Sequence, residues 1–338
     1  MAEIAKALGV SVQTVSAVVN GKPGISSKTQ ARVRDAIVQL DYRPNEQART
    51  LRGAKAKTVG VIIPSITNPY FPEFVRGVEE AARLAGYSIF LCNTDAELKH
   101  LLEYFALIRA NRASGLICSV GIAGEWLGHP DVTRWIHKFT REKVSVVLNG
   151  RLGDNLPVKS VVVDTAAAIR DAARHLLDLG HRRIGLISPP AGLAVTAERV
   201  RAYREAFAGL GCPLDLGLIV PGDFDLEAGA TAARQLMQCA PRPTAIVAAN
   251  DLAAFGAISG LSAMGLRVPD DVSVLGFDDI AFARVFLPAL TTIAQPVYEL
   301  GREALRLATA AIPADEETGE AVVRPARFIV RHSTGPAR

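Results

Sequence analysis

The sequence predicts an α/β protein in which a small helix-turn-helix domain precedes a core of two doubly wound parallel sheets. From residue 58 onward, short apolar runs alternate with amphipathic helical stretches, which is typical of parallel strands covered by helices. The alternation restarts near residue 160, so we expect two lobes. A length of 338 residues fits about two to three domains, and 49% hydrophobic content is sufficient for their cores.

Residues 2–20 predict two short helices joined by a tight turn at Gly9. Apolar residues recur at helical spacing on both sides of this turn, and Ser11 stands where its hydroxyl would cap the second helix. The other face of that helix carries short side chains that fit a DNA major groove. Taken alone, these residues are equally compatible with a helical hairpin inside a larger core. A third helical pattern starting at Ser26 favours a separate three-helix domain.

The distribution of charge also favours a DNA-binding N-terminal domain. Residues 1–57 hold 10 Lys or Arg and 4 Asp or Glu, a balance of +6, whereas the remainder holds 28 basic and 30 acidic residues, a balance of −2. The positive field is therefore concentrated in the first sixth of the chain, although the whole chain carries only +4.

This segment resembles the DNA-binding headpiece and hinge helix of the lactose-repressor (LacI/GalR) family of bacterial transcription regulators. The resemblance rests on the motifs GVSVQTVSAVVNG, ISSKTQARVRDAI, LDYRPN and ARTLR. It implies that the second helix reads the major groove, with Val12 and Gln13 at base edges. It also implies phosphate contacts by short polar side chains, namely Ser11, Thr14, Ser16 and Asn20.

The same resemblance implies a hinge helix over residues 46–52, which Asn45 would cap. In the family this helix enters the minor groove from both subunits. Leu51 would then wedge into the central base step, with Ala48 beside it. A seven-residue helix is too short to be stable alone, so we expect it to fold only when paired with its twin on DNA.

Two departures from the family pattern change what is expected. The family commonly has an arginine directly after the TVS triplet, but this chain has Ala17, which can offer DNA only an apolar contact such as one to a thymine methyl. We therefore expect a different operator preference at that position. Met1 already lies in the first helical turn, where relatives have a capping threonine and further residues, so we expect a natural start upstream or a shortened chain.

The alternating pattern of the core predicts nine strands and seven intervening helices. The strands are expected at 59–64, 87–92, 115–119, 144–149, 160–164, 183–188, 217–220, 244–249 and 272–277. The helices are expected at 70–85, 97–112, 132–140, 165–179, 197–210, 226–239 and 252–264.

Ligands of such open sheets bind beyond the carboxyl ends of the strands, so the expected site is the cleft between the lobes. Polar and aromatic residues gather at these strand ends, although Asn and Asp there also favour helix capping, an even alternative for Asp164 and Asp251. The motifs TNPYF, SVVVD, LGHRRIGLIS, ERVRAYREA, AANDLAAFGAI, VSVLGFDD and LTTIAQP resemble the regulatory core of the same family, which shares its fold with periplasmic sugar-binding proteins.

The resemblance implies an effector site built from polar and aromatic groups. Arg199 would clamp ligand hydroxyls or a carboxylate, because its planar fork suits bidentate contacts. Asn250 and Asp278 would add polar contacts, and Phe71 and Phe224 would supply aromatic faces. The remaining expected effector contacts are Asn149 and Asp164.

We therefore expect three segments: a helix-turn-helix headpiece over 1–44, a hinge helix and linker over 45–57, and an effector-binding and dimerisation domain over 58–338. The expected first lobe comprises 58–159 and 291–324, and the expected second lobe comprises 160–290 and 325–338. The chain would cross between the lobes near 160, 291 and 325.

The sequence argues against an enzyme and against a metal or organic cofactor. Its six histidines are scattered, and G-x-G-x-x-G, a Walker loop and a nucleophile elbow are absent. Cys92, Cys118, Cys212 and Cys239 have no metal spacing, and reduced thiols fit a cytoplasmic protein. No uninterrupted apolar run approaches the roughly 18 residues of a membrane span, and polar residues such as Glu3 and Lys6 interrupt any signal-peptide core at the N-terminus. A cleft-type hydrolase or a transport-binding protein would be the alternatives, but neither would use a basic headpiece with a hinge.

These observations favour a cytoplasmic, homodimeric repressor that binds a pseudo-palindromic operator and responds to a small molecule. The effector is expected to be a sugar or sugar derivative, with a nucleobase as the main alternative. Both induction and co-repression are compatible with the sequence. A dimer is favoured over a tetramer because no leucine-heptad tail follows the last strand.

Overall fold

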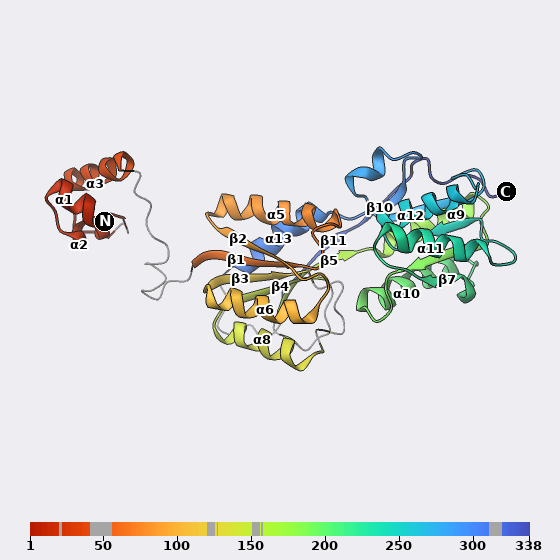
Figure 1. The fold of residues 1–338 in the computed structure, drawn as a ribbon, viewed down its shortest axis with the longest axis horizontal. Helices are drawn as coiled ribbons and strands as arrows, with labels where there is room; N and C mark the ends of the chain where they lie inside the picture. Colours follow the sequence, from red (N-terminus) through yellow and green to blue (C-terminus); the bar gives the residue numbers. More distant parts are fainter. Residues whose placement is uncertain are drawn as a thin grey trace. The chain divides into compact units, whose positions relative to one another are not determined.

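The computed structural model describes residues 1–19, 22–40, 56–119, 126, 128–150, 156, 158–310 and 320–338. The chain divides into two compact units, Met1–Ala56 and Lys57–Arg338 (Figure 1). The expected hinge helix over 46–52 lies outside the described residues, as do Asn20, Asn45, Ala48 and Leu51.

The first unit contains the three predicted helices, α1 (Ala2–Leu8), α2 (Val12–Val19) and α3 (Ser27–Gln39). Gly9 ends α1 with φ 62°, a left-handed conformation that glycine adopts without strain. The small hydrophobic core of this unit consists of Ile4, Ala5, Val15, Val18, Val33 and Ala36. Met1 occupies the N-cap position of α1 without a side-chain hydrogen bond. The three helices therefore close one hydrophobic core of their own, as predicted.

The first lobe of the second unit is built on a six-stranded sheet in the order β11-β5-β4-β3-β1-β2. Its strands are β1 (Ala56–Ile63), β2 (Ser88–Asn93), β3 (Ala113–Cys118), β4 (Ser145–Asn149), β5 (Lys159–Asp164) and β11 (Ala321–Pro325). Helices α5 (Tyr70–Ala85) and α13 (Val297–Thr309) pack on one face, and α6 (Leu98–Ala110) and α8 (Pro130–Arg141) on the other (Figure 1).

The second lobe contains a six-stranded sheet in the order β12-β10-β9-β8-β6-β7. Its strands are β6 (Ile184–Ser188), β7 (Ile219–Pro221), β8 (Ala245–Val247), β9 (Ser273–Asp278), β10 (Thr291–Ala294) and β12 (Arg327–Ile329), and β12 runs antiparallel to β10. Helices α9 (Ala166–Asp178) and α10 (Ala194–Gly209) cover one face, and α11 (Leu226–Met237) and α12 (Asp251–Ala263) cover the other. Two 3-10 turns, η1 (Leu216–Leu218) and η2 (Ala281–Arg284), complete this lobe.

The sheets correct two of the expected lobe boundaries. Strand β5, assigned above to the second lobe, pairs in parallel with β4 and β11 and so belongs to the first. Strand β10, assigned to the first lobe, pairs with β9 in the second. Both strands are largely buried, so their residues show that they are internal but do not indicate which sheet they join. The chain therefore crosses from one lobe to the other after Asp164, after Ala294 and at Ala326.

Glycines allow two helix pairs to pack backbone against backbone. An added Cβ at Gly77 in α5 would overlap the carbonyl oxygen of Tyr298 in α13, and one at Gly301 would overlap that of Phe74. In the second lobe, a Cβ at Gly256 in α12 would overlap the carbonyl oxygen of Leu226 in α11. These close crossings fix the helices that cover each sheet and therefore the positions of the strand ends.

Within the described residues, no single helix is long and apolar enough to cross a membrane, while the bent pair α1 and α2 passes on length and composition alone. The same residues contain no cluster of three or more His, Cys, Asp or Glu that could hold a metal ion.

Candidate functional site

Helix α2 presents the expected DNA-reading residues on its solvent side. Val15 and Val18 are buried in the headpiece core, whereas Val12, with 48% of its surface exposed, and Gln13 face solvent. The Ser11 hydroxyl caps the helix by accepting from the amide of Thr14 at 3.0 Å. Ser16 and Ala17 are half-buried. Ser11 therefore has a structural role whether or not it contacts a phosphate.

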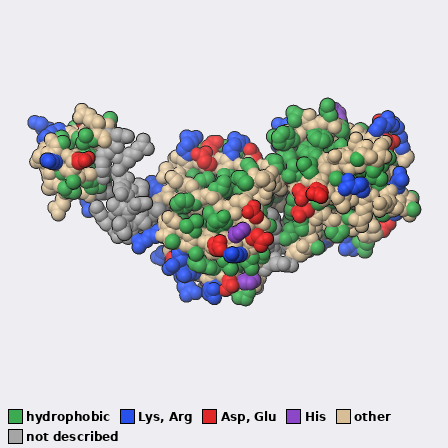
Figure 2. All heavy atoms as spheres, viewed as in Figure 1, with side chains coloured by type: hydrophobic (Ala, Val, Ile, Leu, Met, Phe, Trp, Pro, Cys, Tyr) green, Lys and Arg blue, Asp and Glu red, His purple; other side chains and the backbone are tan. Residues whose placement is uncertain are grey.

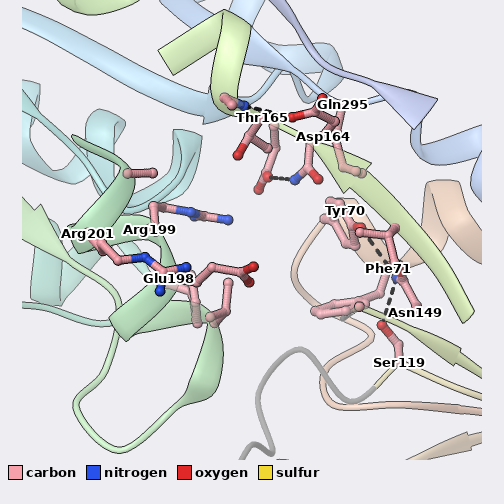
Figure 3. Close-up of a pocket in the computed structure, with 18 of the residues that line it drawn as sticks. Tyr70, Phe71, Ser119, Asn149, Asp164, Thr165, Glu198, Arg199, Arg201 and Gln295 are labelled. Atoms are coloured by element: carbon pink, nitrogen blue, oxygen red, sulfur yellow. Dashed lines mark hydrogen bonds between the residues drawn. The ribbon is translucent and has the colours of Figure 1, made fainter. Parts of the chain in front are cut away.

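A cavity of about 330 Å³ lies between the two lobes of the second unit (Figure 3). Residues from both sheets and from the segments that connect the lobes line it. They are Asn68, Tyr70, Phe71, Ser119, Asn149, Gly150, Val162, Val163, Asp164, Thr165, Ala166, Val195, Glu198, Arg199, Arg201, Ala202, Glu205, Phe224, Asp278 and Gln295. The volume and the mixed lining fit a small-molecule site.

The first-lobe wall is a hydrogen-bonded set around Asn149, which ends β4. Its Nδ2 donates to the Ser119 hydroxyl at 3.0 Å and to the Tyr70 hydroxyl at 3.3 Å. Phe71 packs edge to face on Tyr70, with 5.1 Å between ring centroids. Burial raises the pKa of Tyr70 to about 12, so the phenol stays protonated and able to donate to a ligand. This wall combines an aromatic surface with neutral hydrogen-bonding groups.

The second-lobe wall is centred on Arg199 of α10. Its Nη1 donates to the carbonyl of Ala249 at 2.6 Å, and its guanidinium lies 3.7 Å from the ring centroid of Phe277. Both contacts hold the guanidinium plane in place, and the remaining N–H groups can donate to a ligand in the cavity. Burial lowers the pKa of Arg199, and the nearby Asp278 carboxylate raises it in partial compensation.

Asp278 ends β9 and provides a buried carboxyl group that interacts electrostatically with Arg199 of the same lobe. Burial raises its pKa to about 7, although Arg199 and a hydrogen bond from Gln295 both act to lower it. The Gln295 Nε2 donates to Oδ1 of Asp278 at 2.7 Å. Asp278 also has φ 118°, a backbone conformation that Asp and Asn tolerate better than most residues. The side chain can therefore be acceptor or donor near neutral pH.

Two cavity residues lie where the chain crosses between lobes. Asp164 ends β5, and its Oδ1 accepts from the amide of Ala166 at 3.0 Å at the start of α9. Gln295 follows β10 directly, at the second crossing. A ligand that contacts either residue touches the segments about which the lobes would move.

Six of the seven expected effector residues line this cavity: Phe71, Asn149, Asp164, Arg199, Phe224 and Asp278. Asn250 does not line it. Its Oδ1 caps α12 by accepting from the amide of Ala253 at 2.8 Å, and its Nδ2 donates to the Phe224 carbonyl at 3.2 Å. Asn250 thus positions the neighbouring Phe224, because an amide at a strand end can satisfy a helix start and a loop at once.

Asp251, an even choice between cap and ligand contact in the sequence, is fully buried away from the cavity. It accepts from the Ile280 amide at 2.8 Å and from the Thr292 hydroxyl at 2.6 Å. Desolvation, with Asp278 nearby, raises its pKa well above the ordinary value. Its role is structural, joining α12 to β10.

Ser119, Glu198 and Gln295 line the cavity but were not predicted. Gln295 lies inside the LTTIAQP motif, and Glu198 directly precedes Arg199, so their sequence neighbours were a usable signal. Ser119 follows β3 and reaches the site only through the order of strands in the sheet.

Residues 1–45 match the family described as bacterial regulatory proteins, lacI family, and residues 173–334 match the periplasmic binding protein-like domain. The HTH-type transcriptional regulator DegA of Bacillus subtilis is 34% identical over 334 residues, which cover 99% of this chain and 97% of DegA. The chain belongs to the lacI family of bacterial regulatory proteins. It is a DNA-binding transcriptional regulator, and the predicted fold class is confirmed.

Solved structures of this family align with most of the chain. The lac repressor dimer bound to operator and the anti-inducer ONPF has a TM-score of 0.84 at 26% identity and covers 98% of each chain. The complex of the transcriptional regulator CelR with cellobiose has a TM-score of 0.72 at 29% identity, also over 98% of each chain. A LacI family regulator from Enterococcus faecium with bound ribose has a TM-score of 0.72 at 29% identity over 83% of this chain and 100% of that one.

Proposed function

We propose that this regulator is a repressor whose operator affinity changes when a sugar or sugar derivative binds between its lobes. The observation that carries the proposal is the cavity lined from both lobes and from two chain crossings. A ligand that contacts all of these surfaces favours one spacing of the lobes over others. A coupling of about 1 to 3 kcal/mol is enough for a 5- to 150-fold change in operator affinity.

The lining of the cavity favours a polyhydroxylated ligand. Phe71 and Phe224 offer aromatic faces for the C–H surface of a sugar ring. Arg199 and the Tyr70 hydroxyl can donate hydrogen bonds to hydroxyl groups of a ligand, and Asp278 can accept them. Bound ribose and cellobiose in two structural neighbours support this class of effector.

The expected partner in DNA binding is a second copy of this chain. Both lobes expose large apolar side chains, and Figure 2 shows such side chains gathered on their surfaces. Phe90 and Leu91 lie on β2, an edge strand of the first sheet. Leu84 on α5 of the first lobe is also exposed, and in the second lobe Val285 and Leu287 are 72% and 88% exposed, with Phe282 beside them in the sequence also exposed. Burying these groups in a homodimer would remove the cost of exposing them to water, and the lac repressor in the operator complex is also a dimer.

In this dimer, two headpieces would contact half-sites about one helical turn apart. The hinge segment 46–52, outside the described residues, would fold on DNA and place Leu51 in the central base step. The effector would act by favouring or opposing that pairing. The four free cysteines and the DNA partner agree with a cytoplasmic location.

The proposal is tested by selecting operators from randomised DNA with the full chain. Operator Kd is then measured by fluorescence anisotropy with and without ribose, glucose, cellobiose, glucose 6-phosphate, adenine and hypoxanthine. We expect at least one sugar to change operator Kd fivefold or more. Arg199→Ala should abolish this response and keep operator affinity within about threefold. Arg174→Ala, a control on the exposed side of α9, should respond like the parent chain. A response to purines alone, or to no compound in this panel, would contradict a sugar effector.

A further inference from the structure

A second cavity, of about 550 Å³, adjoins the effector cavity. Three residues line both cavities: Asn68, Phe71 and Phe224. Phe71 belongs to the first lobe and Phe224 to the second, so the boundary that the two cavities share has an aromatic residue from each lobe. We name the first cavity the inner compartment and the second the outer compartment.

The outer compartment has an aromatic and aliphatic wall. Trp126 faces it from the first lobe, and Leu193 and Leu252 line it from the second. With the two phenylalanine rings, Trp126 offers flat apolar surface of the kind that packs on the C–H face of a sugar ring. The compartment is therefore suited to a ring with one apolar face.

The charged residues among the described lining of the outer compartment are all acidic. Asp95, Asp223 and Asp225 line it, and none of the described residues that line it is a lysine or arginine. Three carboxylates, with no cation among the described lining residues, repel a phosphate group and accept hydrogen bonds from hydroxyls. The chemistry favours a neutral ligand over an anionic one.

Hydrogen bonds hold both sides of this compartment in place. In the first lobe, Asn93 donates to Asp95 and accepts from the amide of Ile66 at 2.6 Å, which joins two rim loops. In the second lobe, Asp225 caps α11 by accepting from Ala228 at 2.8 Å. The amide of Phe224 donates to Asp223 at 2.7 Å. Each carboxylate retains acceptor capacity, and the rim is formed before a ligand arrives.

We propose that the outer compartment binds the second ring of a neutral disaccharide whose first ring occupies the inner compartment. This inference rests on the proposed sugar effector and adds its size and charge. Phe71 and Phe224, which line both compartments, pack against the glycosidic linkage, and Trp126 covers the second ring. A phosphorylated monosaccharide is disfavoured because its phosphate would face the three carboxylates.

Calorimetric titration of the full chain with glucose, galactose, cellobiose, maltose, lactose and glucose 6-phosphate tests this. We expect at least one disaccharide to bind tenfold or more tightly than each monosaccharide it contains, and glucose 6-phosphate to bind more weakly than glucose. Trp126→Ala should reduce the affinity for that disaccharide about tenfold and leave monosaccharide affinity within twofold. Because Trp126 also packs against the first-lobe core, Leu193→Trp provides a second variant that fills the compartment from the other lobe.

Tryptophan fluorescence gives an independent readout. The chain has two tryptophans, and Trp135 packs between Phe105 and Phe139 away from both cavities. In a Trp135→Phe background, the emission of Trp126 should shift with the disaccharide and not with its monosaccharides. Equal affinity for monosaccharides and disaccharides, or tighter binding of glucose 6-phosphate, would overturn the outer-compartment proposal alone. A complete lack of sugar binding would instead overturn the sugar effector, and this inference with it.

Discussion

Asn250 donates from Nδ2 to the carbonyl oxygen of Phe224 at 3.2 Å, while its Oδ1 accepts from the amide of Ala253 at 2.8 Å. One buried amide thus caps α12 and also holds the loop that carries an aromatic ring of the cavity. The two functions use different atoms and can be separated by substitution.

Asn250→Ser should retain the cap, because the serine hydroxyl is a good N-cap acceptor. It should lose the hydrogen bond to the Phe224 carbonyl, because serine has no amide nitrogen to donate it. We expect Asn250→Ser to keep the free energy of unfolding within about 1 kcal/mol and to weaken sugar binding. Asn250→Ala should lose about 1 to 2 kcal/mol of stability in addition. Urea unfolding and calorimetric titration measure the two effects, and equal sugar affinity in all three chains would exclude the positioning role.

Asp278 should make stability depend on pH in the direction opposite to an ordinary paired carboxylate. Its pKa rises from 3.8 to about 7 in the folded state, so the folded chain binds more protons between these values. The contribution of Asp278 to the free energy of unfolding is fully present below about pH 4 and is lost as the pH rises through 7. Asp278→Asn should therefore raise the free energy of unfolding at pH 8 by about 1 to 4 kcal/mol, because each tenfold change in acidity is worth about 1.4 kcal/mol. Asparagine also tolerates the positive φ. Parallel stability curves for both chains from pH 4 to 8 would contradict this assignment.

His181 should make the free energy of unfolding depend on pH in the opposite direction to Asp278, with stability lost on acidification. Its Nε2 lies 2.9 Å from the Gly335 carbonyl and its Nδ1 lies 2.8 Å from the Thr244 hydroxyl, a pattern that the neutral ring satisfies. Burial lowers the pKa of His181 below 6.5, so near that pH the imidazole is protonated more in the unfolded chain than in the folded one. This stability is present above pH 6.5 and is lost as the pH falls below it.

His181→Ala should cost about 1 to 3 kcal/mol at pH 7.5, because buried hydrogen-bonding groups of Thr244 and Gly335 lose a partner. The cost should be smaller at pH 5.5, where the parent chain has already lost part of this contribution. Urea titrations of both chains at the two pH values provide the comparison. A cost that grows on acidification would show that the ring is charged in the folded protein.

The close crossing of α11 and α12 should be intolerant of a single methyl group. Gly256→Ala is expected to lose about 1 to 3 kcal/mol, because its Cβ would overlap the Leu226 carbonyl oxygen and the helices must separate. Gly209→Ala, at the end of α10, meets no atom within 4 Å and should be neutral or gain up to about 1 kcal/mol. Thermal unfolding distinguishes the two, and similar midpoints would contradict the packing argument.

The sequence allowed the fold class to be predicted because local signals agree with the fold. Gly9, Ser11 and Ser26 mark real helix ends, and the alternation of strands and helices follows the two sheets. The lobe boundaries were misplaced because a buried strand such as β5 has the same composition in either sheet. The segment 217–220, expected to be a strand, divides into η1 and the short β7.

The candidate site was predictable where a strand end and a motif coincide, as at Arg199 and Asp278. Asn250 was placed in the cavity because capping and ligand contact use the same residue type at the same position. Ser119 was missed because its proximity to Asn149 arises from the parallel pairing of β3 and β4. Trp126 was missed because only the folded first lobe brings it to the rim of the outer compartment.

Thermodynamic linkage tests the central claim most directly. The effector Kd is measured by calorimetry for the full chain alone and for the same chain saturated with operator. The operator Kd is measured by anisotropy with and without saturating effector. If effector binding in the cavity controls DNA binding, the factor by which operator changes the effector Kd must equal the factor by which effector changes the operator Kd. We expect this common factor to be at least fivefold. An effector that binds equally well to free and operator-bound protein would contradict allosteric control through this cavity.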